Sequence, residues 1–401
     1  MKRLVLLLIL LLALPVLAQD DVTPLDPDTL TARELIRLPL LSAPARTSAH
    51  LAPDGERLMH VRGTTFCLYA LIGVQIGCSD MVEQGVTDNR GLNIEADSIS
   101  WSPDGEYMAF TTDVWRLLRD SDIWVLDVNS GRFHNMTDDG YDGRVGFGDG
   151  IPERATIDTT PTWMPDGRLS FARHAPTADG VPPSLWTISP TGGMPEKMTD
   201  FETVPDHFSI IYGMEWSPDG STLAYIVDSR DNPFAGVWLY DPLEDHHRPL
   251  RYIPEGVQGY LRVSYSPDGQ NLLLLDYRRD TYRASGSRPT EETGYTVVNI
   301  ESGEVHELLS ALAVTSAGWL PAGGLVYSSP TIAGDTGGLF VTADVSAPGR
   351  KVLDFPEVDG SPFPFFAPTS LQVAPLFVSP NGRLLLATAG ELTLSVELSS
   401  E

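Results

Sequence analysis

A short turn motif is repeated along the whole chain at intervals of 49 to 62 residues. It reads WSPDG at residues 101–105 and again at 216–220, and it degrades to LPAG and SPNG in the last two copies. Proline fixes φ at the first central position of a tight turn, while Asp or Asn and then Gly tolerate the unusual backbone angles that follow. The seven prolines are Pro53, Pro103, Pro165, Pro218, Pro267, Pro321 and Pro380. A fold built from seven similar units is therefore predicted.

Each unit has the pattern of short strands. A large apolar residue precedes the turn by two positions, and an apolar or alternating run such as EYMAFTT or NLLLLDY follows it. Three units add a second run, DIWVLD, SLWTIS or GVWLYD, and then a polar strand such as RFHNMTD. Four strands per unit and almost no helical pattern predict an all-β fold, a β-propeller of seven four-stranded blades, over residues 44–401. Another all-β solenoid is the alternative. Trp124, Trp186 and Trp238 recur at one repeat position, so we expect them to pack between blades.

The repeated unit, apolar-x-W-S-P-D-G followed by I-W-x-x-D and x-x-M-T-D, resembles the propeller repeat of TolB-like (WD-like) proteins. The same repeat occurs in the propeller domains of prolyl-oligopeptidase and dipeptidyl-peptidase enzymes. The resemblance covers roughly residues 44–398 and is clearest in units 2 to 4. It implies the fold; it says little about function, since this scaffold hosts binding proteins and enzymes alike.

The N-terminus has the pattern of an export signal. Lys2 and Arg3 precede an apolar run from Leu4 to Leu14, and cleavage is expected after Ala18, which makes residues 1–18 a signal peptide. We therefore expect an exported protein, periplasmic or extracellular, with no transmembrane span after cleavage. Residues 19–43 contain ELIRLPLLSA, which could supply the missing outermost strand of the last blade. A short helix is the alternative, because Thr31 to Glu34 fits a capping box.

Two cysteines, Cys67 and Cys78, are the only ones in the chain. If Ile72-Gly73 forms a two-residue hairpin turn, these cysteines occupy opposite positions on the two strands. Oxidising conditions outside the cytoplasm favour a disulfide between them, and two free structural thiols are the alternative.

The formal net charge of −27 argues against one class of partner. Nucleic acid is disfavoured because phosphate binding requires a basic surface. The acidity is explained by solubility, or by a cationic partner or divalent metal. We expect a monomer that binds a protein or peptide partner.

No catalytic residues are assigned from the sequence. A peptidase of the related families needs a hydrolase domain with a Gly-x-Ser-x-Gly turn, which is absent. The sialidase-type turn, Ser-x-Asp-x-Gly, is also absent, because Asp104 and Gly105 are adjacent. A metal-dependent hydrolase that acts at the mouth of the central channel is the alternative function. Its metal ligands would come from several blades, so the lack of a local motif does not exclude it.

One stretch has some features of a calcium loop. In DDGYDGRVGFGD, residues 138–149, Asp138, Asp142 and Asp149 fall at loop positions 1, 5 and 12, so Ca²⁺ is a possible cofactor. Gly140 at position 3 argues against it, and a plain Asp/Gly-rich connector is preferred. Otherwise no cofactor is expected. The run Glu244-Asp245-His246-His247 is interpreted as a solvated turn and not as a set of metal ligands.

The candidate binding face follows from where the repeat varies. The Pro-Asp-Gly turns keep nearly constant length, whereas the connections from the second to the third strand of each unit differ, and these connections lie on the opposite edge of the ring. Those loops carry eight arginines against nine acidic residues in a strongly acidic chain, with aromatic residues beside them. Arginine binds carboxylates and stacks on aromatic groups. The predicted ligand-binding residues are Arg116, Arg119, Arg173, Arg230, Tyr277, Arg278, Arg279, Tyr282 and Arg283. The alternative is that these arginines pair with neighbouring acids as ordinary loop charges.

Overall fold

The structure is a computed structural model of the 401-residue chain. It describes residues 26–39, 47–86, 98–111, 121–141, 155–175, 181–201, 210–228, 234–279, 291–308, 316–329, 338–354, 376–379, 384–389 and 392–400, together with Ile94 and Pro152 and with residues 72, 256, 258, 346 and 348 excepted. The predicted signal peptide lies outside these ranges. None of the described segments forms a helix with the length and hydropathy that crossing a membrane requires.

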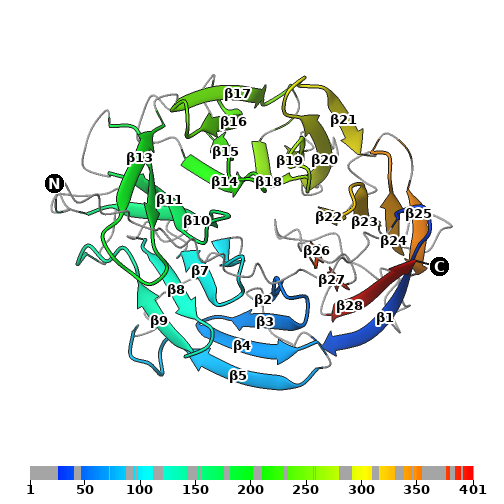
Figure 1. The fold of residues 1–401 in the computed structure, drawn as a ribbon, viewed down its shortest axis with the longest axis horizontal. Coiled ribbons are helices and arrows are strands. Elements are labelled where there is room, and N and C mark those ends of the chain that lie inside the picture. Colours follow the sequence, from blue (N-terminus) through cyan, green and yellow to red (C-terminus); the bar gives the residue numbers. More distant parts are fainter. Residues whose placement is uncertain are drawn as a thin grey trace, which may run out of the picture.

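The described strands form four-stranded antiparallel sheets arranged around a central axis (Figure 1). Six blades each consist of four consecutive strands. Blades 1 to 3 are β2 (Thr47–Leu51), β3 (Arg57–Arg62), β4 (Thr65–Ala70) and β5 (Gln75–Asp80); β6 (Ser100–Trp101), β7 (Tyr107–Thr111), β8 (Ile123–Asp127) and β9 (Arg132–Asn135); β10 (Ile157–Trp163), β11 (Leu169–His174), β12 (Ser184–Ile188) and β13 (Glu196–Asp200). Blades 4 to 6 are β14 (Ile210–Trp216), β15 (Leu223–Asp228), β16 (Gly236–Asp241) and β17 (His246–Tyr252); β18 (Gly259–Tyr265), β19 (Asn271–Arg279), β20 (Glu291–Asn299) and β21 (Val305–Leu308); β22 (Ser316–Trp319), β23 (Leu325–Ser329), β24 (Gly338–Thr342) and β25 (Arg350–Asp354). The prediction of an all-β propeller with four-stranded blades is confirmed.

The remaining sheet joins the two ends of the chain. It contains β26 (Phe377–Val378), β27 (Leu384–Ala389) and β28 (Leu392–Ser400), and its outermost strand is β1 (Leu30–Pro39). β1 pairs antiparallel with β28, from Leu30 opposite Ser400 to Pro39 opposite Leu392. The segment is a strand and not the alternative helix, because the open edge of β28 offers backbone partners along its length. Six of the four-stranded sheets are therefore continuous in sequence, whereas this closing sheet is composite and takes its outermost strand from the N-terminal segment.

The repeated turns share one hydrogen bond and one glycine conformation where they are described. The glycine of each turn donates its N–H to the carbonyl three residues earlier, at 2.8–2.9 Å, in the six blades from Gly55 to Gly323. Each of these glycines has positive φ, from 69° to 88°, which explains why glycine occupies the position. In the three Ser-Pro-Asp-Gly copies the serine hydroxyl also donates to the aspartate, as from Ser217 Oγ to Asp219 Oδ1 at 2.6 Å. Pro380 lies outside the described residues.

The tryptophans of the motif connect neighbouring blades. Trp101 Nε1 donates to the carbonyl of His50 at 3.1 Å, Trp163 Nε1 to that of Ser100 at 3.2 Å, and Trp319 Nε1 to that of Ser264 at 3.0 Å. Each acceptor belongs to the innermost strand of the preceding blade. The indole thus fills the space between two blades and satisfies its own donor there.

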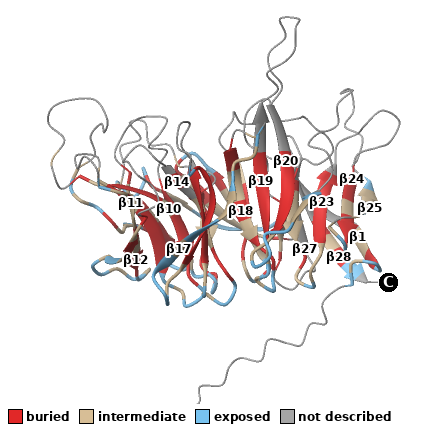
Figure 2. Ribbon diagram, turned by 90° about the horizontal axis from the view of Figure 1, so that it is seen from above, coloured by how far each residue is buried: buried red, intermediate tan, exposed pale blue. Residues whose placement is uncertain are grey.

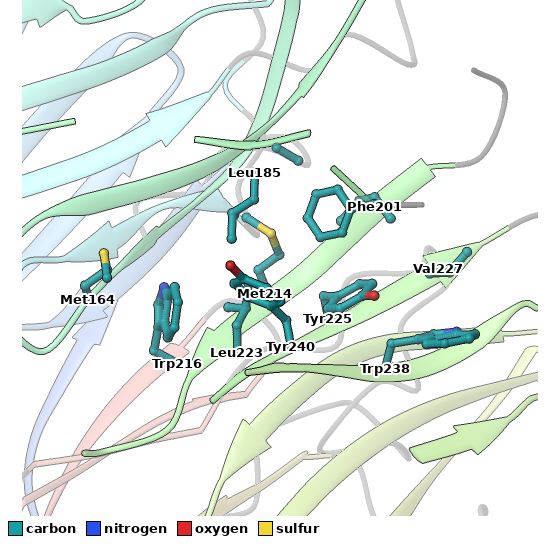
Figure 3. Close-up of a cluster of buried hydrophobic side chains, with 12 residues drawn as sticks. Met164, Leu185, Phe201, Met214, Trp216, Leu223, Tyr225, Val227, Trp238 and Tyr240 are labelled. Atoms are coloured by element: carbon teal, nitrogen blue, oxygen red, sulfur yellow. The ribbon is translucent and has the colours of Figure 1, made fainter. Parts of the chain in front are cut away.

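The hydrophobic core is divided into clusters between successive blades. Figure 3 shows the cluster between blades 3 and 4, where Leu185 and Phe201 face Tyr225 and Trp216. Apolar side chains on both faces of each sheet are buried in this way, which explains why the second strand of a unit is apolar throughout. Trp238 belongs to this cluster, and Trp124 and Trp186 pack against two others, so their predicted packing role is confirmed.

Cys67 on β4 and Cys78 on β5 form a disulfide, as predicted. They are opposite each other in the strand register. The register shifts by one residue between Leu68 and Tyr69, so the turn is longer than the assumed two residues. The shift lies beyond the cysteines and leaves their pairing unchanged.

Candidate functional site

The two faces of the ring differ in how much their connecting sequences vary from blade to blade. Figure 2 shows the ring edge-on, with the Pro-Asp-Gly turns along its lower edge and the far ends of the second strands toward its upper edge. β19 and β20 are nine residues each, whereas the second and third strands of the other five continuous blades have five or six. The extra length of β19 is at the end away from its turn, because β18 pairs with β19 only as far as Tyr277, whereas β20 pairs with it as far as Arg279.

Three predicted binding residues lie on this projecting part. Tyr277, Arg278 and Arg279 end β19, and Arg278 and Arg279 are opposite Glu292 and Glu291 on β20. Opposite charges at directly paired positions stabilise a hairpin. The register therefore places each arginine opposite a glutamate at the end of the paired strands.

Arg173 is the other predicted binding residue that the structure describes. Its guanidinium donates two hydrogen bonds to Asp158, from Nε to Oδ1 and from Nη2 to Oδ2, each 2.7 Å. It also lies over the Trp186 ring, 4.7 Å from the centroid. Burial alone would lower the pKa of Arg173, but Asp158 raises it above the ordinary value. Arg173 is on blade 3 and the arginines of β19 are on blade 5, so the structure does not bring these residues together.

The other five predicted residues lie outside the described ranges. They are Arg116, Arg119, Arg230, Tyr282 and Arg283.

A polar network joins blades 2 and 3 beside Arg173. The Thr111 hydroxyl donates to the carbonyls of Asp122 and Asp158, both at 3.1 Å, and the Asp158 N–H donates to the carbonyl of Ser121 at 2.8 Å. Asn135 Nδ2 donates to Asp122 Oδ2 at 2.7 Å. Burial and the nearby carboxylates of Asp158 and Asp139 raise the pKa of Asp122 to about 7, against the effect of the Asn135 hydrogen bond. This network fixes the strand ends from which the variable connections leave.

The calcium-loop hypothesis receives no support from the described part of the loop. Asp138 is exposed, and its Oδ1 accepts the Gly140 N–H at 2.8 Å. Asp139 accepts the N–H groups of Tyr141 and Thr156 at 2.8 and 2.7 Å. Asp142 and Asp149 lie outside the described residues. Among the residues that are described, no group of three or more His, Cys, Asp or Glu side chains is arranged to hold a metal ion.

The run from Glu244 to His247 is only partly the solvated turn that was expected. Glu244, Asp245 and His246 are exposed. His247 instead stacks on Tyr240, with centroids 4.5 Å apart, and its Nδ1 is 2.9 Å from the Tyr225 hydroxyl. Burial lowers the pKa of His247 to about 4, so the ring is neutral at physiological pH. His247 therefore belongs to the core between blades 3 and 4.

A group of ionisable residues on the innermost strands was missed by the sequence reasoning. It comprises His50 on β2, Glu215 on β14 and Arg262 on β18, which belong to blades 1, 4 and 5. Burial, with Arg262 and His60 nearby, lowers the pKa of His50 to about 3. Arg262 is therefore within electrostatic range of a residue on a blade that is not its neighbour, across the central axis.

We call His50, Glu215 and Arg262 the channel group. Glu215 provides its carboxyl group. Its Oε1 accepts the Tyr265 N–H at 3.1 Å. Burial raises the pKa of Glu215 to about 7, opposed by the Tyr265 hydrogen bond, Arg262 and Ser264. A carboxyl group that titrates near neutrality can act as an acid or base, and the neighbouring guanidinium can bind an anion. The sequence signal that could have identified this group is a charged residue within an innermost strand. Glu215 directly precedes Trp216, and Arg262 lies three residues before Tyr265.

The comparisons with known proteins agree on the fold. No protein-family model matches the chain. The chain is similar to an uncharacterized peptidase, YuxL, of Bacillus subtilis, with 26% identity over 219 residues, which is 52% of this chain and 25% of the relative. It is 27% identical over 136 residues to dipeptidyl-peptidase 5 of Porphyromonas gingivalis, covering 33% of this chain and 17% of that protein. The chain thus spans a quarter or less of the length of these relatives.

Two solved propellers show the same likeness. An oligogalacturonate lyase in complex with manganese has a TM-score of 0.55 and 15% identity, covering 94% of this chain and 92% of that one. TolB from Acinetobacter baumannii has a TM-score of 0.42 and 17% identity, covering 75% of this chain and 61% of that one. At such identities the likeness concerns the fold alone. The likeness of architecture rests on the lyase, and the proteins found include TolB and peptidases, whose propeller repeat the sequence resembles.

Proposed function

We propose that this chain is an exported, non-enzymatic β-propeller that binds a protein, a peptide or an envelope component on the face of the variable connections. One observation carries the proposal: β19 and β20 are longer than the second and third strands of the other continuous blades, while the described turns of the opposite face share one hydrogen bond and a glycine of positive φ. Variation on one face of a constant scaffold is typical of a binding surface. The leader-like N-terminus and the Cys67–Cys78 disulfide support export to an oxidising compartment.

The proposed surface is centred on blade 5. Tyr277, Arg278 and Arg279 would meet the ligand, with Tyr282 and Arg283 from the same hairpin, and Arg116, Arg119 and Arg230 from blades 2 and 4. Arg173 has a different role in this proposal. Because its guanidinium is held by the buried Asp158, it fixes the ends of β10 and β11 and does not bind the ligand itself.

The proposal treats the chain as one propeller after an N-terminal leader. Residues 1–18 are the signal peptide, residues 19–43 include the strand that closes the ring, and the composite sheet is the seventh blade. The pairing of β1 with β28 supports this division. The pairing also predicts that removal of residues 19–43 exposes the edge of β28 and destabilises the ring.

A hydrolase working at the channel mouth is the second candidate. The channel group of His50, Glu215 and Arg262 supports it, because these buried ionisable residues on the innermost strands of three blades have perturbed pKa values, and Arg262 acts electrostatically on the other two. The names of the two curated relatives also point to peptidases. Metal assistance would need ligands outside the described residues, such as Asp142 and Asp149.

The test compares capture of one identified partner by defined variants. The mature protein is used to isolate its partner from the native envelope, and capture is then quantified with purified components. R278Q/R279Q/R283Q and R116Q/R119Q should each weaken capture at least tenfold without lowering the melting temperature by more than a few degrees. R168Q is the matched control, since Arg168 is an exposed arginine on the turn face, paired with Asp166 at 2.8 Å.

Unchanged capture in both arginine variants would exclude this face. The hydrolase candidate is tested separately with E215Q, assayed on blocked peptides. Loss of peptide cleavage in that variant, with capture intact, would favour the enzyme.

A further inference from the structure

The turn face opens between blades 5 and 6, where a contact that joins other successive turns is missing. A Cβ atom placed on Gly220 would lie 3.5 Å from the Pro165 ring, and one on Gly269 would lie 3.6 Å from Pro218 Cδ. The turn of one blade therefore packs directly on the proline of the preceding turn. A Cβ on Gly323, in blade 6, would meet no atom within 4 Å. The turns of blades 5 and 6 thus stand apart.

The length of the blade 6 turn explains the gap. Leu320 N–H is bonded to the carbonyl of Gly324, four residues on, whereas Ser217 N–H in blade 4 is bonded to Thr222, five residues on. Leu320 also replaces the serine, and Ala322 replaces the aspartate, of the full motif. A turn that closes one residue earlier does not reach the Pro267 ring. Blade 3 has a similarly short turn, and a Cβ on its Gly167 would likewise meet no atom within 4 Å, so a short turn accompanies the lost contact in both blades.

A pocket of about 570 Å³ occupies this gap, between the turns that begin at Pro267 and Pro321. Its volume is in the range of about 300–1,000 Å³ that ligand pockets have. The charged or titratable groups among its lining residues are Asp268, His306 and Asp344, and none of the lining residues is Lys or Arg. Trp319 lines the same pocket, with its ring orientation fixed by the hydrogen bond to Ser264. The pocket therefore combines carboxylates with a fixed aromatic ring.

Asp268 is the carboxylate best placed for a ligand. It is exposed, and its Oδ1 accepts the Ser266 hydroxyl at 2.6 Å and the Gln270 N–H at 3.0 Å, which fix its orientation. Asp54 and Asp166, at the same repeat position, are paired with Arg57 and Arg168. For Asp268 no ion pair is found within the described part of the chain. Its negative charge is thus available where two other turns are already neutralised.

We propose that this turn-face pocket binds a lysine or arginine side chain of a protein or peptide partner. The cation would lie between Asp268 and Asp344 and against the Trp319 ring, an environment that favours ammonium and guanidinium groups. The formal net charge of −27 would attract a basic partner to this face by long-range electrostatics. The site is on the opposite side of the ring from the proposed loop-face surface, so it would be a second point of attachment.

The experiment follows the Trp319 indole N–H signal of the ¹⁵N-labelled mature protein by NMR, assigned by its absence in W319F. The probes are acetyl-Gly-Lys-Gly-amide and its Arg, norleucine and Glu counterparts. The Lys and Arg peptides should shift the signal saturably, and the other two should bind at least tenfold more weakly. D268N should weaken Lys-peptide binding about twofold to fivefold, as expected for one exposed ion pair. D268N/D344N should weaken it further.

Two controls separate the pocket from general acidity. Asp219 makes the same turn hydrogen bonds in blade 4 but does not line the pocket, so D219N should leave the affinity unchanged. A322F places a ring into the pocket and should abolish the shift while the melting temperature stays close to that of the parent. Equal binding of the norleucine peptide, equal weakening by D219N and D268N, or no saturable shift with any peptide would overturn the proposal. Tighter binding of 1,4-diaminobutane than of the Lys peptide would also overturn it, in favour of a free amine.

Discussion

Asp158 and Arg173 face each other across the β10–β11 pair, joined by two hydrogen bonds of 2.7 Å, and the Asp158 side chain is completely buried. A buried carboxylate of this kind depends on its partner, because desolvation of an unpaired charge is expensive. The pair lies where the variable connections of blades 2 and 3 begin. Its loss should therefore affect both stability and the loop face.

Replacing Arg173 by alanine should lower the free energy of unfolding by about 3–5 kcal/mol, because it leaves Asp158 buried without its partner. Urea denaturation followed by tryptophan fluorescence measures the change. R168A is the control: its pair with Asp166 is exposed, and the cost should be at most about 1 kcal/mol. A loss in R173A no larger than in R168A would contradict the role assigned to the buried pair.

The raised pKa of Asp122 predicts a pH-dependent effect of the D122N substitution. Asp122 ionises near pH 4 in the unfolded chain and near pH 7 in the folded protein, so its contribution to stability is complete below pH 4 and is lost as the pH rises to about 7. The amide introduced by D122N does not ionise, and its oxygen can accept the Asn135 N–H. Relative to the parent, D122N should therefore gain stability between pH 4 and 7, on the order of 2 kcal/mol because the residue is partly exposed.

Melting temperatures of both proteins at half-unit pH intervals provide the measurement. The difference in melting temperature between D122N and the parent should be smallest at pH 4 and constant above pH 7. E215Q should behave in the same direction, because the pKa of Glu215 is also raised to about 7. A difference that does not change with pH would mean that Asp122 ionises in the folded protein at its ordinary pKa.

The repeat was sufficient to predict the propeller because its information is local. Proline, aspartate and glycine specify each turn, and an aromatic residue two positions earlier specifies the end of an innermost strand. The channel group was not predictable in this way. His50 is far in sequence from Glu215 and Arg262, and its electrostatic interaction with Arg262 depends on closure of the ring.

The N-terminal strand illustrates a conflict between local and long-range preference. Thr31 to Glu34 has the pattern of a helix start, but the β28 edge offers a ladder of backbone partners, and the pairing with β28 is what forms. His247 was misjudged for a related reason. Its neighbours in sequence are exposed, and only the strand register directs its ring to Tyr225 and Tyr240.

The disulfide should contribute measurably to stability. Cys67 and Cys78 are 11 residues apart, so their bond closes a short loop and should add roughly 2–3 kcal/mol through the reduced entropy of the unfolded chain. C67A/C78A should melt at a lower temperature than the oxidised parent. Addition of dithiothreitol should lower the parent to the level of the variant and leave the variant unchanged. Two thiols that react in the unreduced, denatured parent would show that the bond does not form.

The serine of the turn motif should contribute about as much to the free energy of unfolding as one buried hydrogen-bonding group does. Ser217 is buried, donates to Asp219 Oδ1 at 2.6 Å and accepts the Thr222 N–H at 3.0 Å. The Ser217 hydrogen bond, with further bonds from Ser221, lowers the pKa of Asp219 to about 2. S217A removes the donor and leaves the Thr222 N–H without its acceptor, so it should cost about 1–2 kcal/mol.

The pKa of Asp219 reports the same bond independently. In S217A it should rise toward the ordinary value of an aspartate, which a carboxyl ¹³C NMR titration measures directly. S221A is the comparison, since Ser221 is exposed and keeps its backbone N–H bond to Asp219; it should raise the pKa less and cost little stability. If S217A and S221A change the pKa equally, the serine before the proline has no special role. The preference for serine there would then reflect its size and not its hydroxyl group.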